Sequence, residues 1–532
     1  MIPHVDSEPD MLVADLEARL RPLEVAIGRA WWECNTESSP AADSRREALE
    51  LAHRELLADP ERYAALRRAR DAEPADPLVR RQVDLLCDAC APNQVAEELR
   101  RRIVELETRA DSTFANFRGD IEGARADDNA IAGILRTSND SRERRAAWEA
   151  SKQVGAEVAA TVRELARVRN AAARSLGARD HFALALATSE LDEDRLFATL
   201  AEVDAATAEP FAAWKADLDE SLARRFGTTV DALAPWHYDD PFLQEPPAAG
   251  AVDLDFVFAD RDLAALTLDT YDGLGLDVRG VLTRSDLFAR PGKSQHAFCV
   301  DLDRDGDVRV LCNVEPRARW MDTMLHEFGH AAYDSNVDRG APWFLRTAAH
   351  PVTTEAVAML AGRLHRDPEW LEVVAGVPAA EIEALRPRLE GARRAALLTF
   401  ARWVLVMTTF ERALYADPDA DLDTLWWDLV ERIQRVPRPD GRSAPDWAAK
   451  VHFAVAPVYY QNYLLGELLA SQLDATVRQR FGGIVGRPGV GEWFVRELFA
   501  PGATLRWDHL VERATGRPLS AAAFGAALGA PA

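Results

Sequence analysis

The sequence predicts a predominantly helical fold. Apolar residues recur at spacings of three and four through most of the 532 residues, as in helices that bury one face. Only one segment shows the alternation that is typical of strands. No Gly- or Ser-rich linker divides the chain, so we expect a single domain over residues 1–532.

The helical pattern begins near the N-terminus. Segments 44–72 and 92–110 place Leu and Ala at helical spacing opposite a charged face. Further long helices are expected at residues 141–176, 192–226, 380–416, 421–435 and 446–480. Residues 227–253 contain four prolines and two glycines, which predicts a long surface loop.

Residues 294–314, "SQHAFCVDLDRDGDVRVLCNV", alternate and are rich in Val, Phe and Cys. Asp305-Gly306 lies between the two halves, which predicts a β-hairpin. The aspartates that alternate from Asp301 also resemble the start of a calcium loop. Such a loop needs a carboxylate at its twelfth position, and Cys312 stands there, so an acidic turn is favoured.

The charge balance limits the partners. Lys and Arg number 63 against 87 Asp and Glu, so the net charge is 63 − 87 = −24. A nucleic-acid-binding protein needs a basic stripe, so no nucleic-acid partner is expected. The sequence contains no run of 18 apolar residues, so it gives no indication of a membrane-spanning helix. The acidic N-terminal segment lacks the features of a secretory signal, and we expect a cytoplasmic protein.

A metal-binding pattern lies at residues 326–330, His-Glu-Phe-Gly-His. At 100° per residue, His326 and His330 project from one helix face, one turn apart, where two imidazoles can hold one zinc ion. Glu327 is offset and would accept a proton from a water whose pKa the zinc lowers. The alternative is a half-buried helix whose histidines are satisfied by hydrogen bonds.

A catalytic zinc needs a third protein ligand. Pro351 marks a helix start, and Glu355 follows early in that helix, 25 residues after His330. Its apolar neighbours predict a buried helix, where a carboxylate needs a partner. A salt-bridged core glutamate is the alternative reading, and His350 is a rival third ligand.

Donors for an oxyanion are available further along the chain. His452, Tyr459, Tyr460 and Tyr463 cluster within residues 450–473. Tyr460 and Tyr463 are three apart and share a helix face. Without the zinc motif, these residues would be interpreted as core aromatics.

Several blocks together resemble the angiotensin-converting-enzyme family of zinc peptidases, with the thimet-oligopeptidase and oligopeptidase F families as wider relatives. The block from Arg309 to Leu364 carries the motif, an R-x-x-C lead-in and the spacing to the glutamate. The block "LWWDLVERIQRVPRPDGRSAPDWAAKVHFAVAPVYYQNYLL" resembles the family's K-x-H and tyrosine region. "KSQHAFCVDLD" resembles its substrate-aligning strand.

The resemblance implies an almost entirely helical, two-lobed ellipsoid. Two subdomains would flank a deep central cleft, with one zinc ion at its floor and a small β-hairpin beside the active site. The implied site residues are the zinc ligands His326, His330 and Glu355, the base Glu327, the oxyanion donors His452 and Tyr463, the substrate-aligning His296 and Ala297, and the carboxylate-binding Lys450, Tyr460 and Tyr459.

Two departures concern the carboxylate end of the substrate. The gap from His452 to the tyrosine pair is one residue longer than in the converting-enzyme pattern, so Tyr459 could replace Tyr460. The family's glutamine for the terminal carboxylate falls near Asp255. An aspartate there would repel a carboxylate.

Two further departures concern ions. The family places an aspartate one turn after the third ligand to orient a zinc histidine, and Met359 occupies that position. Gln461 and Asn462 stand where the family's chloride-binding arginine is expected. Chloride activation is therefore not expected.

The sequence thus predicts a zinc-dependent peptidase that hydrolyses short peptides in an enclosed cleft and releases C-terminal dipeptides. An oligoendopeptidase of the thimet or oligopeptidase F type is the first alternative. A hydrolase specialised for one modified peptide is another. A catalytically silent peptide-binding scaffold is the non-enzyme alternative, and the intact Glu327 argues against it.

Overall fold

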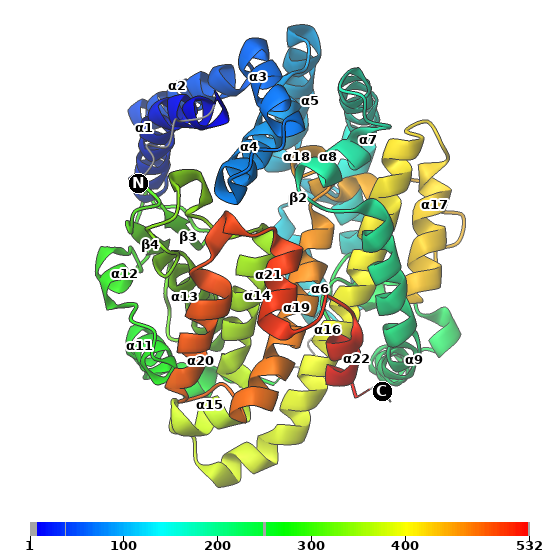
Figure 1. Ribbon diagram of the computed structural model, residues 1–532. Coiled ribbons are helices and arrows are strands. Elements are labelled where there is room, and N and C mark those ends of the chain that lie inside the picture. The colour runs from blue at the N-terminus through cyan, green and yellow to red at the C-terminus, as the bar shows by residue number, and fades with distance from the viewer. Residues whose placement is uncertain (1–7, 38, 248–251, 530–532) are drawn as a thin grey trace. The chain divides into compact units, whose positions relative to one another are not determined.

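The computed structural model describes residues 8–37, 39–247 and 252–529 (Figure 1). Helices dominate these ranges, and the strands within them form two small antiparallel two-stranded sheets. The predicted helical fold is therefore confirmed. Among the described helices, none is long and apolar enough to cross a membrane.

The chain divides into two compact units. Unit 1 comprises Met1–Gln94, Asp253–Arg386 and Leu465–Ala523, and unit 2 comprises Val95–Val252, Pro387–Leu464 and Phe524–Ala532. Helices α16, α19 and α22 each contribute residues to both units. The predicted single domain with a central cleft stays a prediction.

Unit 1 contains the zinc-motif helix and the hairpin predicted at residues 294–314. Buried side chains of its N-terminal helices pack around Leu16, Leu20 and Val83, together with Trp343. Its elements are α1 (Glu8–Thr36), α2 (Pro40–Leu57), α3 (Pro60–Asp71), α4 (Pro77–Cys90), α10 (Asp255–Phe258), α11 (Leu263–Leu274), α12 (Arg279–Arg284), β3 (Phe298–Asp301), β4 (Val308–Leu311), α13 (Ala318–Ser335), α14 (Pro351–Gly362), α15 (Pro368–Val373), most of α19 (Tyr460–Phe481), α20 (Pro488–Phe494) and α21 (Trp507–Thr515).

Unit 2 is built around the long helix α7, which packs against α5 and α6. Its elements are α5 (Glu97–Asn116), β1 (Gly119–Ile121), β2 (Ala124–Ala126), α6 (Asp128–Thr137), α7 (Ser141–Ser175), α8 (His181–Thr188), α9 (Glu193–Phe226), most of α16 (Ala379–Ala416), α17 (Leu422–Leu429) and α18 (His452–Val455). The short α22 (Ala522–Ala527) ends the described chain.

Many of these helices have an aspartate as their N-cap residue. Each aspartate side chain accepts a backbone N–H of the first turn, which would otherwise lack a partner. The residues that do this include Asp59, Asp76, Asp127, Asp140, Asp180, Asp192, Asp262, Asp367 and Asp421. Part of the acidic excess is therefore used to start helices.

The helical pattern of residues 44–72 falls in α2 and α3, which are separated at Asp59-Pro60 because the proline begins a new helix with Asp59 as its cap. One predicted helix is wrong in its extent. Residues 446–480 are not one helix, because short helical turns precede Tyr460 and α19 begins only there. Val458 has a left-handed φ of 54°, which no continuous right-handed helix can accommodate.

Candidate active site

Helix α13 carries the zinc motif and is held from several sides. The Asp255 carboxylate accepts the Ala318 N–H at the start of α13 (2.9 Å), and the Tyr271 hydroxyl donates to the Leu325 carbonyl (2.7 Å). Gly329 lets α14 approach closely, because a Cβ there would lie 2.8 Å from the Ala358 Cα. Asp255, which we had expected near the substrate carboxylate, instead fixes the N-terminus of the motif helix.

Helix α14 presents Glu355 to the two histidines. It begins at Pro351, and the His350 side chain accepts the Val352 N–H (3.0 Å) as its N-cap. His350, the rival candidate for the third ligand, thus uses its Nδ1 to cap helix α14. A Cβ at Gly466 of α19 would lie 3.2 Å from the Glu355 Cβ, so α19 packs directly against α14 at Glu355.

The three predicted ligands converge. Glu355 Oε2 lies 3.7 Å from His326 Nε2 and 3.9 Å from His330 Nε2, and the three ligand atoms all lie within 4.8 Å of one another. Ligands at about 2.0–2.1 Å from a tetrahedral zinc ion are themselves roughly 3.3 Å apart. The separations in the structure need only a small contraction to hold the ion.

The protonation of the ligands suits a metal. Burial lowers the pKa of His326, and it lowers the pKa of His330 to about 3. Both imidazoles are therefore neutral at pH 7 and keep a lone pair for a metal. Burial also raises the pKa of Glu355, and a bound dication would counteract this rise.

Thr354 supplies support that the sequence analysis missed. Its hydroxyl lies 2.6 Å from His330 Nδ1. When Nε2 binds a metal, Nδ1 carries the proton, so the hydroxyl accepts it and fixes the ring orientation. Met359 lies against α19 instead, its sulfur 3.6 Å from the position of a Cβ on Gly466.

Glu327 lies beside this group with a perturbed pKa. Burial raises that pKa to about 8, and the Glu355 carboxylate adds to the rise, while a hydrogen bond from the Cys299 backbone opposes it. Cys299 belongs to β3, so the base lies between α13 and the hairpin. A zinc ion would lower this pKa and leave a carboxylate that can accept a proton near neutral pH.

The predicted hairpin is present next to α13. Phe298 pairs with Leu311 and Asp301 with Val308, and β3 and β4 both contact α13. His296, which is exposed, and Ala297 lead into β3. Their alignment of a substrate backbone stays a prediction.

The acidic turn of the hairpin is neutralised by arginines. Arg309 donates to both oxygens of Asp307, and Arg21 and Arg346 each pair with Asp305. These contacts favour the acidic-turn reading over a calcium loop.

The second group of predicted residues lies together in unit 2. The Tyr460 ring lies 4.7 Å from the His452 ring and 5.5 Å from the Tyr463 ring, and Tyr463 lies 5.2 Å from Tyr459. The Tyr460 hydroxyl accepts from Trp403 Nε1 (3.0 Å). Which of Tyr460 and Tyr459 has the predicted carboxylate role stays a prediction. The joint action of this group with the metal ligands of unit 1 stays a prediction.

The second half of the chain is similar to a known peptidase family. Residues 280–530 match the model of Peptidase family M3. M3 peptidases are zinc-dependent and related to thimet oligopeptidase, one of the wider relatives expected from the sequence. No curated protein matches the chain. The match supports a metallopeptidase that acts on peptides. The finer likeness to the converting-enzyme family stays a prediction.

Gln244, which lies outside the M3 match and was not singled out from the sequence, contacts the predicted carboxylate-binding Lys450. Lys450 Nζ donates to Gln244 Oε1 (2.7 Å) and lies 5.8 Å from the Tyr460 ring. Burial lowers the pKa of Lys450 to about 8, against the opposing charges of Asp240 and Glu245. Gln244 therefore lies beside the predicted carboxylate-binding group, and its contribution to that group stays a prediction.

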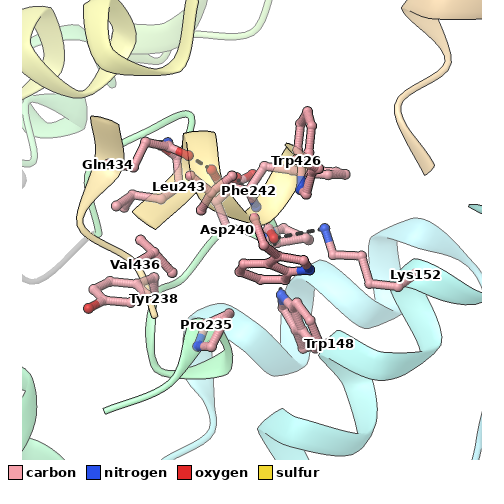
Figure 2. Close-up of a pocket in the computed structure, with 13 residues that line it drawn as sticks. Trp148, Lys152, Pro235, Tyr238, Asp240, Phe242, Leu243, Trp426, Gln434 and Val436 are labelled. Atoms are coloured by element: carbon pink, nitrogen blue, oxygen red, sulfur yellow. Dashed lines mark hydrogen bonds between the residues drawn. The ribbon is translucent and has the colours of Figure 1, made fainter. Parts of the chain in front are cut away.

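The loop that carries Gln244 is fixed to its own unit. The Pro241 carbonyl accepts from Trp148 Nε1 (3.0 Å) and Lys152 Nζ (2.9 Å), and Gln434 Nε2 donates to the carbonyls of residues 242–243 (Figure 2). These bonds explain how a loop without periodicity places one side chain reproducibly.

The pocket in Figure 2 is a packing gap beneath this loop. Its cavity of about 20 Å³ holds roughly one water molecule. The Phe242 ring is part of its lining, with Lys152 Nζ 3.1 Å from the ring centroid and Lys450 Nζ at 5.5 Å. A peptide cannot enter this space, so it is not the substrate site.

Proposed function

We propose that the protein is a zinc-dependent peptidase that hydrolyses short peptides and releases C-terminal dipeptides. The observation that carries the proposal is the convergence of His326 Nε2, His330 Nε2 and Glu355 Oε2 beside the buried Glu327. The M3 match over residues 280–530 supports the same chemistry.

The chain's own residues would divide the work. Zinc bound by the three ligands supplies a Lewis acid and an open coordination position for water. Glu327 accepts the proton of the attacking water and passes it to the leaving amine. His452 and Tyr463 donate hydrogen bonds to the oxyanion. Helix α19 carries both Tyr463 and Gly466, and Gly466 packs against Glu355, which supports this assignment.

The release of dipeptides is supported by the group around Lys450. A charged Lys450 with Gln244 and the Tyr460 hydroxyl offers the donors that a C-terminal carboxylate needs, and Lys450 and Gln244 are already in contact. His296 and Ala297 would align the peptide backbone along the edge of the hairpin.

An oligoendopeptidase is the second candidate. The M3 match favours it at least as well, and it does not need a carboxylate-binding group. The two candidates differ in their products, since one shortens peptides by two residues at the C-terminus and the other cuts internally.

The test combines metal analysis with mass spectrometry of the products from a peptide library. We expect one zinc ion per chain and peptides that are two residues shorter, and C-terminal amidation should suppress this cleavage. Internal cuts that are insensitive to amidation would favour the oligoendopeptidase. A zinc-loaded protein that turns over no library peptide would contradict both.

Glu327→Gln tests the mechanism. All three ligands remain, so the variant should bind zinc as the wild type does, while kcat falls at least about 100-fold because a general base contributes roughly 10²–10⁴. A variant that keeps its zinc and its kcat would refute the role of Glu327.

A further inference from the structure

Val458 has a backbone conformation that its side chain disfavours. Its φ is 54°, in the left-handed region, where a β-branched residue is an outlier. Val458 lies between His452 and Tyr463, in the segment that is one residue longer than the converting-enzyme pattern. A single left-handed residue turns the chain sharply, and α19 begins two residues later at Tyr460.

Two side chains hold this conformation through the backbone of Val458. The Glu411 carboxylate accepts its N–H (2.8 Å), and Gln461 Nε2 donates to its carbonyl (2.6 Å). Glu411 lies on α16 and is 2% exposed. Strained conformations persist only where the surroundings determine them strongly, and here both polar backbone groups of one residue are bonded to side chains.

A third side chain holds the preceding part of the segment. Arg169 of α7, 2% exposed, donates to the carbonyls of Phe453 (3.1 Å) and Ala454 (2.5 Å). Its guanidinium is itself bonded to Tyr415 (3.1 Å) and Glu107 (2.6 Å). The chain that follows His452 is therefore anchored to α7 before the turn and to α16 at the turn.

We infer that Glu411 is a positioning residue, which keeps Val458 left-handed and thereby sets the first turn of α19, with Tyr460 and Tyr463, against His452. This inference rests on the proposed function, in which His452 and Tyr463 donate to the oxyanion. If Val458 relaxes to a negative φ, the peptide planes on either side rotate. The tyrosines then leave their places beside His452. Small misplacements of catalytic donors are costly, since about 1 Å can reduce a rate 10²-fold.

The acceptor oxygen, rather than the negative charge, carries this role. Burial raises the pKa of Glu411 to about 8, and its hydrogen bond from Val458 and the charge of Arg169 oppose the rise. A neutral amide in the same place still accepts the Val458 N–H. Glu411→Gln should therefore be tolerated, whereas Glu411→Met, which has similar length and no oxygen, should not.

A double-mutant cycle in the zinc-loaded enzyme tests the inference. Glu411→Met should lower kcat at least about 10-fold with less than about a threefold change in KM and an unchanged zinc content. Val458→Gly should stay within about threefold of wild type, because glycine adopts positive φ without strain. The double variant should recover at least about half of the logarithmic loss, because glycine no longer needs to be held.

Thr408→Val is the matched control. Thr408 is buried on α16, one turn before Glu411, and its hydroxyl has no hydrogen-bond partner among the described residues. The kcat of the Thr408→Val variant should equal that of the wild type. Two results would overturn the inference and leave the peptidase function standing. One is a Glu411→Met enzyme with wild-type kcat, and the other is a loss of kcat in Glu411→Met that the added Val458→Gly change does not recover.

Hydrogen exchange separates this inference from the proposed function. Backbone amides of residues 452–463 should exchange faster in Glu411→Met than in wild type, and at the wild-type rate in Thr408→Val. If the wild type hydrolyses no peptide, the proposed function and the inferred role fail together, and the exchange data still show whether Glu411 holds the segment. Unchanged exchange in Glu411→Met would refute that hold whatever the activity.

Discussion

Replacement of Thr354 by valine tests the support of one predicted zinc ligand, His330. The change removes the hydroxyl that lies 2.6 Å from His330 Nδ1 and keeps the volume of the side chain. The Nδ1–H then lacks an acceptor, and the ring loses the bond that aims Nε2 at Glu355. Loss of such a partner typically weakens metal binding 10- to 100-fold, which corresponds to about 1.4–2.7 kcal/mol. We expect the zinc Kd of Thr354→Val to rise by this factor.

The assay is a titration of the metal-free protein with zinc in competition with a chromophoric chelator. Thr354→Ser keeps the hydroxyl and should bind zinc within about threefold of wild type. Thr323→Val is a control on α13, because the hydroxyl that it removes donates to the Arg319 carbonyl. A Thr354→Val protein with wild-type zinc affinity would show that the ring is oriented by packing alone.

Two further predictions concern substrate binding and packing. Since the pKa of Lys450 lies at about 8 and the charged form binds a carboxylate, KM for peptides with a free C-terminus should rise as the pH passes above 8. Amidated peptides should show no such rise, and equal pH profiles for both would exclude the role of Lys450. Gly329→Ala should destabilise the protein by about 1–3 kcal/mol in chemical denaturation, because the new methyl group meets the backbone of Ala358 at 2.8 Å. Gly391→Ala, at an exposed helix position with no atom within 4 Å of the new Cβ, should instead stabilise it by about 0.5–1 kcal/mol, and equal effects of the two would refute the packing argument.

The long helices could be predicted where local signals mark their ends. The predicted 141–176 agrees with α7, which begins after the cap Asp140, and the predicted 192–226 agrees with α9, which ends at the left-handed Gly227. Prediction failed at residues 446–480 because apolar periodicity continues through a turn. The left-handed Val458 depends on partners from other helices, and no local pattern encodes them.

The convergence of the three candidate ligands could also be predicted, because helix geometry fixes the spacing of His326 and His330, and Glu355 lies on a helix whose start is marked by Pro351. The hydrogen bond that orients His330 could not be predicted. Thr354 is an ordinary threonine in the sequence, and its contact with His330 depends on how closely α13 and α14 pack. The close approach at Gly329 was a usable signal, since a glycine inside a helix usually has a packing reason.

Gln244 was missed for a different reason. It lies in a loop without periodicity, where the sequence offers no spacing that would place it beside Lys450. The position of the loop depends on long-range donors such as Lys152 and Gln434. Pairs of distant residues of this kind cannot be read from one sequence.

The charges around Lys450 decide between the two proposed specificities. Its Nζ donates to Gln244 Oε1, while Gln244 Nε2 is already bonded to Asp240 (3.0 Å). A substrate carboxylate would therefore use the remaining N–H donors of Lys450, and it gains a donor from Gln244 only if that amide leaves Asp240. Asp240 and Glu245 stabilise the charged lysine, and the same two charges repel an incoming carboxylate. Dipeptide release requires that the attraction of Lys450 for the substrate carboxylate exceeds the repulsion from Asp240 and Glu245. Cleavage at an internal peptide bond places no carboxylate there and is not opposed by these charges. The difference in KM between free and amidated peptides below pH 8 measures that balance directly.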